Sequence, residues 1–305
     1  MARLSISSAC AGFNAVKAAL IAGILREETG YDIGVEVLVP KNSTHESLVE
    51  RAEGAKISSI HAPFMLLPSL FDLRKQFERA VWNWKLAPLE DACKLAHQLG
   101  VPIVVHSDTI LRLRARGNLT AHMFGDARVL VENTEPMFAL GEPLDDQPNA
   151  IQELLASGHR RIGVCLDFGH LAMAAFRKGS WTGEAKDFVE RVLDPQMCTL
   201  QSLDVMVEQV HIHDFDHRDT SDKPDHKRLG DGQIPVAEMI GVLCNNNAHL
   251  LAILEVNYLG SQWGYIRNTL TGWGDKMVLE GIRKDFATLV AAVPKGVQLI
   301  KASPR

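Results

Sequence analysis

Short apolar runs alternate with longer helix-compatible segments along the whole chain. The runs are rich in Val, Ile and Leu and are continuous, which is typical of strands buried on both faces of a parallel sheet. Helix-compatible segments separate most of them, and Gly30 is placed as the stop of the first, over residues 14–30. The strand candidates are residues 3–9, 31–40, 56–61, 101–106, 127–132, 161–167, 207–212 and 249–255.

Repeated strand–helix units without a linker or a composition shift predict one α/β domain over residues 1–305, a closed (β/α)8 TIM barrel. A doubly wound open sheet is the alternative, but no GxGxxG or GxxxxGK[ST] motif follows any run, so the usual phosphate-binding loops of open sheets are missing. Residues 109–127 are predicted as a loop longer than a minimal barrel needs, with three arginines. Residues 294–305 are predicted as a weakly ordered tail.

The third to the eighth runs each carry, at or next to their carboxyl end, a residue type that binds metal ions. In a parallel barrel these ends lie on one face, where active sites are built. One histidine at a strand end is more often structural, but six such residues in register favour a shared site. These six residues are His61, His106, Glu132, Asp167, His211 and Glu255.

Further candidate ligands follow the sixth and seventh runs. His170 comes three residues after Asp167, and the segment 211–231, with four histidines and six aspartates, contains Asp225 next to His226. Imidazoles and carboxylates without a thiolate suit Zn²⁺, Mn²⁺ or Fe²⁺. We expect one to three divalent ions, with zinc or manganese favoured. His213 shares a strand face with His211; it and Asp214 are candidate substrate contacts, and a structural hydrogen bond fits His213 equally well.

Composition and charge narrow the function classes. Hydrophobic residues make up 46% and charged residues 23%, the balance of a soluble globular protein. The net charge of −5 gives no basic excess for a nucleic acid, which disfavours that partner without excluding it locally. Five cysteines without a CxxC pair indicate a reducing compartment. Since no apolar segment approaches the ~20 residues of a membrane span, we expect a cytoplasmic protein.

The chain resembles the xylose isomerase-like TIM-barrel superfamily, which includes sugar epimerases, sugar-phosphate isomerase-like proteins and endonuclease IV. The resemblance spans nearly the whole barrel and is carried, in order, by SIHAPF, VVHSD, VLVENTEP, CLDFGHLAMA, VHIHDFD, DHKRLGDGQI and LEVN. It implies one metal site of His61, His106 and Glu132, and it implies that Glu132 bridges to a second site. The second site is completed by Asp167, His211 and Glu255.

The same resemblance places His170 and His226 at the third metal site of endonuclease IV. Relatives carry Asp-x-His there, whereas Pro224 stands two residues before His226 in this chain. Asp225 or Asp222 is the candidate substitute, although neither position is in register. The departure puts the third ion in question.

Three functions fit these residues. A metal-dependent isomerase or epimerase of a small sugar, sugar phosphate or polyol needs only the central site, where Glu132 or Glu255 would move a proton between carbons. A zinc-dependent phosphodiesterase resembling endonuclease IV, acting on abasic-site DNA or another phosphate ester, would use two bridged ions. The extra histidines favour that alternative, as does Phe64, which matches an aromatic of that family and is a candidate substrate contact. A metal-retaining binding protein is the third reading. We favour the first, with a small carbohydrate as partner.

Overall fold

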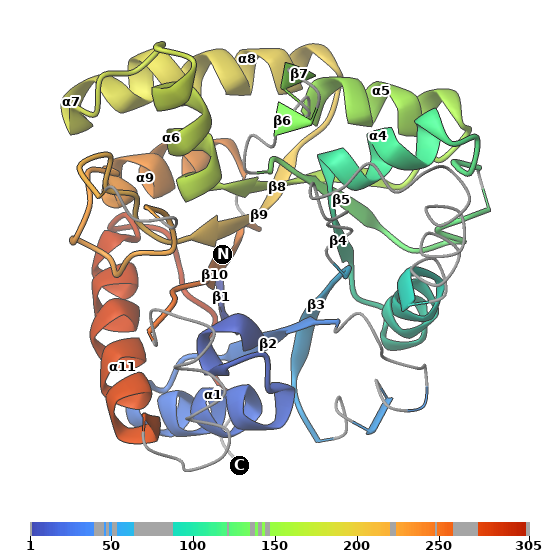
Figure 1. Ribbon diagram of the computed structural model, residues 1–305. Coiled ribbons are helices and arrows are strands. Elements are labelled where there is room, and N and C mark those ends of the chain that lie inside the picture. Colours follow the sequence, from blue (N-terminus) through green and yellow to red (C-terminus); the bar gives the residue numbers. More distant parts are fainter. Residues whose placement is uncertain are drawn as a thin grey trace.

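The computed structural model describes residues 2–39, 46, 49–50, 54–63, 88–120, 122–134, 138–139, 142–143, 147–219, 224–247, 249–258 and 274–302. Parallel strands close into an eight-stranded barrel, in which the last strand pairs with the first (Figure 1). The predicted TIM barrel is therefore confirmed. In chain order the barrel strands are β1 (Arg3–Ser7), β2 (Ile33–Leu38), β3 (Ile57–His61), β4 (Ile103–His106), β5 (Val129–Glu132), β8 (Ile162–Asp167), β9 (Val207–Ile212) and β10 (Leu251–Leu254).

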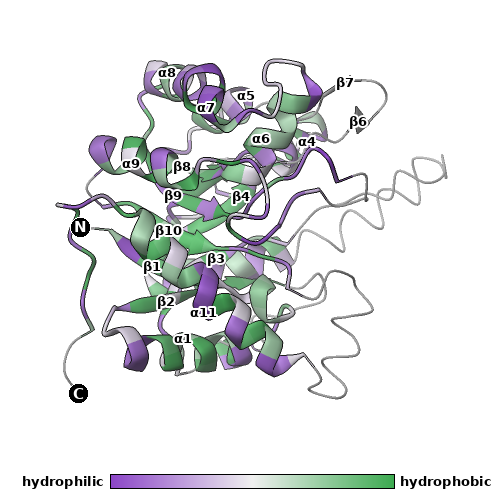
Figure 2. Ribbon diagram, turned by 90° about the vertical axis from the view of Figure 1, so that its left-hand side faces the viewer, coloured by the Kyte–Doolittle hydropathy of each residue, from purple (hydrophilic) through white to green (hydrophobic). Residues whose placement is uncertain are grey.

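Helices surround the barrel and cover the outer faces of its strands (Figure 1). The strands are largely hydrophobic, whereas the helices carry hydrophilic residues as well (Figure 2). Residues 88–99 are also helical. The named helices are η1 (Ser8–Ala11), α1 (Ala15–Thr29), α4 (Ser107–Ala115), α5 (Gln147–Ala156), α6 (Phe168–Arg177), α7 (Ala185–Phe188), the π-helical η2 (Val189–Leu193), α8 (Asp194–Ser202), α9 (Val236–Asn246) and α11 (Asp275–Ala292).

The ends of α1 show how local sequence sets an element. The Asn14 side chain caps the first turn by accepting a hydrogen bond from the amide of Lys17 at 3.0 Å. Gly30 ends the helix in the left-handed conformation, with φ of 68°, and its amide donates to the carbonyl of Arg26. The predicted helix stop at Gly30 is confirmed.

The barrel interior changes character along the strands. A small apolar cluster of Val104, Leu130 and Cys165 lies inside, separate from the main core between the barrel and the helices. Other interior positions are polar and buried, among them Glu36 and Gln209. The fold therefore brings charged groups into the barrel, where they need partners to offset the loss of water.

Two expectations about connecting segments are wrong. Residues 107–115 form helix α4, in which Arg112 pairs with Asp108 one turn earlier at 3.2 Å and Arg114 pairs with Glu153 of α5 at 2.7 Å. The stretch 109–127 therefore begins as a helix, and these two arginines serve helix packing. The tail is also ordered through residue 302, since Leu299 bridges to Ala2 and Lys301 to Tyr31.

A short hairpin of β6 (Phe138–Ala139) and β7 (Glu142–Pro143), which the hydrophobic pattern did not predict, follows β5. Within the described part of the chain, none of the helices combines the length and the apolar character needed to cross a bilayer.

Candidate metal centre

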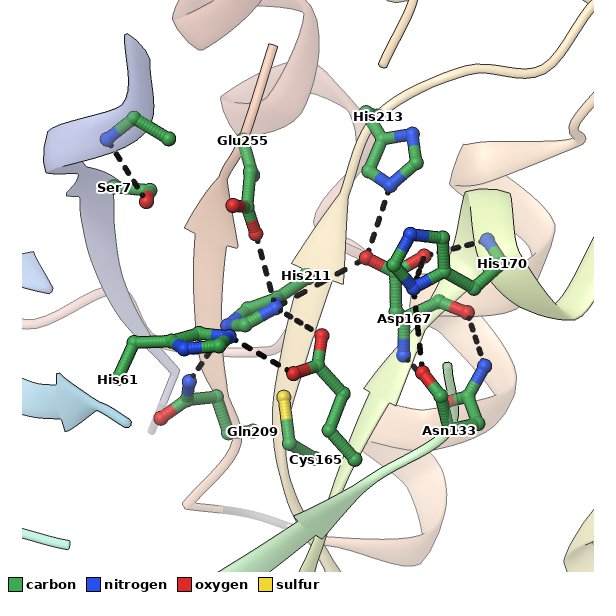
Figure 3. A network of polar contacts seen from close by, with 12 residues as sticks. Ser7, His61, Asn133, Cys165, Asp167, His170, Gln209, His211, His213 and Glu255 are labelled. Atoms are coloured by element: carbon green, nitrogen blue, oxygen red, sulfur yellow. Dashed lines mark hydrogen bonds and ion pairs between the residues drawn. The ribbon is translucent and has the colours of Figure 1, made fainter. Parts of the chain in front are cut away.

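The predicted ligands converge at the carboxyl end of the barrel (Figure 3). The central group, defined as Glu132, Asp167, His211 and Glu255, offers ligand atoms that all lie within 4.8 Å of one another. These four residues are buried. His211 is one residue before the end of β9, which ends at Ile212 as predicted, and Glu255 comes directly after β10, which ends one residue earlier than predicted. The convergence inferred from the strand ends is present.

A second group shares a carboxylate with the first. His61, His106 and Glu132 also have ligand atoms within 4.8 Å of one another, and we call them the inner histidine group. Oε2 of Glu132 lies 3.0 Å from Nε2 of His61 and 3.1 Å from Nε2 of His106. Oε1 of the same side chain lies 2.7 Å from Nδ1 of His211. Glu132 therefore presents one oxygen to each group, which is the geometry of a bridging ligand.

Both ring nitrogens of His211 face carboxylates. Nδ1 lies 2.7 Å from Glu132, 3.0 Å from Glu255 and 4.0 Å from Asp167. Nε2 lies 3.1 Å from Glu36. Burial lowers the pKa of His211, but the acidic groups around it, Cys165, Glu36, Glu132 and Glu255, together raise it well above its ordinary value. A proton on Nδ1 thus takes the place that a cation would occupy among the carboxylates.

Glu36 is a buried carboxylate that the sequence analysis missed. It contacts Nε2 of His211, whereas Glu132 contacts Nδ1 of the same ring. Oε2 of Glu36 accepts hydrogen bonds from Ser59 at 2.9 Å, from Gln209 at 2.7 Å and from Nε2 of His211 at 3.1 Å. Burial raises the pKa of Glu36, but the charge and hydrogen bond of His211 lower it overall, so the side chain is ionised. The sequence did contain a signal for Glu36, namely an acidic residue within the apolar run that forms β2.

Asp167 is fixed by the backbone and by a neighbouring strand. Its Oδ1 caps α6 by accepting from the amide of His170 at 2.6 Å. The Asn133 side chain accepts from the amide of Asp167 at 2.8 Å and donates to its carbonyl at 2.9 Å, which joins β5 to β8. Burial raises the pKa of Asp167, but His170 and His213 lower it overall. Asn133 is a second residue that sequence reasoning missed.

Asp225 joins His170 and His226 in a third group, the outer group. Oδ2 of Asp225 lies 2.9 Å from Nδ1 of His226 and 3.6 Å from Nε2 of His170. Burial raises the pKa of Asp225, but the two histidines lower it strongly. His226 has a φ of 54°, a left-handed conformation that costs a residue other than glycine roughly 1–3 kcal/mol. Asp225 therefore does meet both histidines, despite Pro224.

The three candidate substrate contacts have different positions. Both carboxylate oxygens of Asp214 are occupied, because they accept from four backbone amides of the following loop, those of Phe215, Gly230, Gly232 and Ile234. This arrangement favours loop anchoring over substrate contact. His213 is fully buried and lies between the central and outer groups. Phe64 lies outside the described residues.

The affinity for a metal ion should fall as the pH is lowered, because protons compete with the ion for the ligand histidines. Burial lowers the pKa of His61, but Glu132 and Glu36 raise it to about 9 from 6.5. Below that pH the metal-free ring holds a proton that an ion must displace, so the apparent affinity should drop up to tenfold per pH unit for each proton released. The matching folded-state stability is fully present below 6.5 and is lost as the pH rises through about 9.

Titration of the metal-free protein with Mn²⁺, repeated between about pH 6.5 and 9, measures this dependence. A His61→Gln variant is the control, since removing one titrating ring should make the slope shallower. An affinity that stays constant above 6.5 would contradict the expectation.

Comparisons with known proteins agree with this architecture. Residues 27–277 match the model of the family described as xylose isomerase-like TIM barrel. A search of curated proteins found no match.

Similar solved structures include a D-tagatose 3-epimerase-like protein, with a TM-score of 0.51 and 15% identity over 94% of this chain and 98% of that one. A xylose isomerase domain containing protein from Salmonella typhimurium LT2 has a TM-score of 0.52 and 14% identity over 94% of this chain and 97% of that one. The IolI protein with a zinc atom has a TM-score of 0.51 and 15% identity over 96% of this chain and 99% of that one. These likenesses show the shared fold. Because the family model spans most of the barrel, the chain belongs to the xylose isomerase-like TIM barrel family.

Proposed function

We propose that this protein is a metal-dependent isomerase or epimerase acting on a small sugar, sugar phosphate or polyol. The observation that supports this most strongly is the central group, whose four ligand atoms lie within 4.8 Å of one another. Three of its members are buried carboxylates and one is a histidine. Concentrated negative charge away from water requires cations, and a divalent ion would supply positive charge at the point where the three carboxylates meet.

The donor set fits a divalent ion. Three carboxylates and one imidazole suit Mn²⁺ or Zn²⁺ better than a soft thiolate-binding metal. His211 would ligate through Nδ1, because its Nε2 faces Glu36. When bound, the ion would polarise a carbonyl and a hydroxyl oxygen of the sugar.

The chain itself supplies two candidate proton carriers. Glu132 lies at the end of β5 and Glu255 directly after β10, and β8 and β9 separate these strands in the barrel. The two carboxylates therefore approach the centre from different directions. One would accept a proton from a carbon next to the carbonyl. If the other starts as the carboxylic acid and gives its own proton to the opposite face, that carbon is inverted. If the first instead returns its proton to the adjacent carbon while a proton moves between the two oxygens, the sugar is isomerised.

A second candidate function is zinc-dependent hydrolysis of a phosphate ester, including abasic-site DNA. The bridging position of Glu132, with His61 at 3.0 Å and His106 at 3.1 Å, favours it. Two ions on a shared carboxylate would hold both the attacking and the leaving oxygen of such an ester. The net charge of −5 counts against a nucleic-acid substrate.

A metal count of the purified protein separates the two functions. We expect about one tightly held ion per chain, with interconversion of ketoses or aldoses in the presence of Mn²⁺ that a chelator abolishes. Elemental analysis gives the stoichiometry, and NMR of a sugar panel gives the activity. Two or three ions per chain with cleavage of a phosphodiester or of abasic-site DNA would establish the second function instead. A protein without bound metal would contradict both.

The proposal also places the enzyme in the cytoplasm as one barrel unit over residues 1–305. All five cysteines are free thiols and four of them are buried, which suits a reducing compartment.

A further inference from the structure

We propose that His213 is a positioning residue that holds Asp167 through its Nε2–H and is itself fixed by the backbone of His226. It would thereby link the outer group to the central group. This inference rests on the proposed metal-dependent function, and it assigns His213 a role distinct from those of ligand and substrate contact.

The hydrogen bonds of His213 determine which ring nitrogen carries its proton. The backbone amide of His226 donates to Nδ1 of His213 at 2.8 Å. A backbone amide always carries a hydrogen, so Nδ1 acts as the acceptor and the single proton of the neutral ring sits on Nε2. Nε2 lies 2.9 Å from Oδ2 of Asp167, an ideal distance for donation to a carboxylate. The carbonyl of Asp214, at 3.4 Å from Nδ1, is the weaker contact.

The same arrangement argues against His213 as a metal ligand. One of its ring nitrogens does lie within 4.8 Å of ligand atoms of His170 and His226. For Nε2 to bind an ion, however, the ring would have to give up its only proton while Nδ1 still accepts from the amide. That would leave an anionic imidazolate in a fully buried position, which is costly. Donation to Asp167 requires no such change.

Packing fixes the ring from two further sides. The ring stacks on that of His226, with centroids 4.0 Å apart and an angle of 9° between the planes. Gly169 also lies against the ring, since a Cβ at this position would come within 1.9 Å of Cε1 of His213. Glycine is therefore required at this position of α6 for the ring to sit where it does.

The backbone of His226 is itself fixed by neighbouring segments, so an unbroken series of hydrogen bonds leads from it through His213 to Asp167. The His226 carbonyl accepts from the amide of Asn257 at 3.0 Å, and the next residue, Lys227, bridges to Asp214. A change at the outer group that shifts the His226 backbone would move the His213 ring and with it Oδ2 of Asp167. The affinities of the outer and central groups should therefore be coupled.

Two substitutions separate the two ends of the imidazole. In His213→Asn the shorter amide can accept from the His226 amide but does not reach Asp167. In His213→Gln the longer amide can donate to Asp167 from near the position of Nε2. We expect the Mn²⁺ affinity of the central group to fall 10–100-fold in the Asn variant and to stay within a few-fold of wild type in the Gln variant, with the number of ions per chain unchanged.

Three results would overturn the inference. Loss of one ion per chain at unchanged central affinity would make His213 a ligand. Unchanged affinity and stoichiometry in both variants, or equal losses in both, would leave it a packing residue. Imidazole ¹⁵N–¹H spectra of the metal-free wild type supply a test that needs no variant to fold, because a proton on Nδ1 of His213 would exclude the proposed donation. Wild-type protein without metal would contradict the proposed function, while the spectra still decide the state of His213.

Discussion

Replacing Glu132 by Gln is expected to abolish binding of the tightly held ion at the central group and, when metal is in excess, of any further ion at the inner histidine group. Glu132 is the residue that these groups share, with Oε1 toward His211 and Oε2 toward His61 and His106. An amide carries no negative charge and turns one of these two positions into a donor, so it cannot bridge cations. Asp167→Asn should abolish binding at the central group alone, because Asp167 is a member of that group only.

Elemental analysis and Mn²⁺ titration of both variants measure this difference. Glu208→Gln is the matched control: it makes the same chemical change on β9, where Glu208 pairs with Arg128 outside the site, and should retain the wild-type metal content. Wild-type metal content in both Glu132→Gln and Asp167→Asn would exclude the ligand assignment.

The barrel should remain folded in these variants. Removing one partner of a buried ion pair costs roughly 3–5 kcal/mol, against a typical total stability of about 5–15 kcal/mol. Circular dichroism and thermal unfolding of the metal-free proteins check this point. An unfolded Glu132→Gln protein alongside a folded Asp167→Asn protein would mean that Glu132 is needed to hold the three histidines together.

The hydrophobic pattern was sufficient to predict the barrel and the face on which its ligands meet. Each continuous apolar run corresponds to a strand because both faces of a barrel strand are buried, so that position along the sequence directly reports position in the sheet. The strand ends His61, His106, Glu132 and Asp167 follow from that register, since parallel strands end on one face.

Contacts between distant segments could not be predicted in this way. Asp214 follows β9 and resembles a substrate contact in sequence, yet its partners are backbone amides of Gly230, Gly232 and Ile234 in a loop without periodicity. The role of His213 depends on a backbone amide 13 residues away. Such hydrogen bonds arise from loop conformation, on which the hydrophobic period carries no information.

Glu36 shows how a residue can be visible in the sequence and still be assigned no role. It interrupts an apolar strand, but its function depends on facing His211 across the barrel at a sequence separation of 175 residues. Side-chain alternation puts Glu36 on the inner face, and Gln209 and Ser59 complete its hydrogen bonds there.

Replacing Glu36 by Gln is accordingly expected to weaken Mn²⁺ binding at the central group 10–100-fold while leaving every candidate ligand in place. The carboxylate accepts from Nε2 of His211 and thereby directs Nδ1 toward Glu132 and Glu255. A neutral amide accepts more weakly, and if its own N–H groups face Gln209 or Ser59, donors oppose donors. The orientation and basicity of His211 should both suffer.

Ser59→Ala is the matched control for Glu36→Gln, because it removes one donor at 2.9 Å but keeps the charge of Glu36, and should change the affinity by no more than a few-fold. Titration with Mn²⁺ at a fixed pH compares the two variants, and thermal unfolding shows whether each is folded. Equal affinity in Glu36→Gln and wild type would mean that His211 is oriented by its ligand-side carboxylates alone. Equal losses in the two variants would assign the effect to packing inside the barrel, since only Glu36→Gln removes the charge that faces Nε2 of His211.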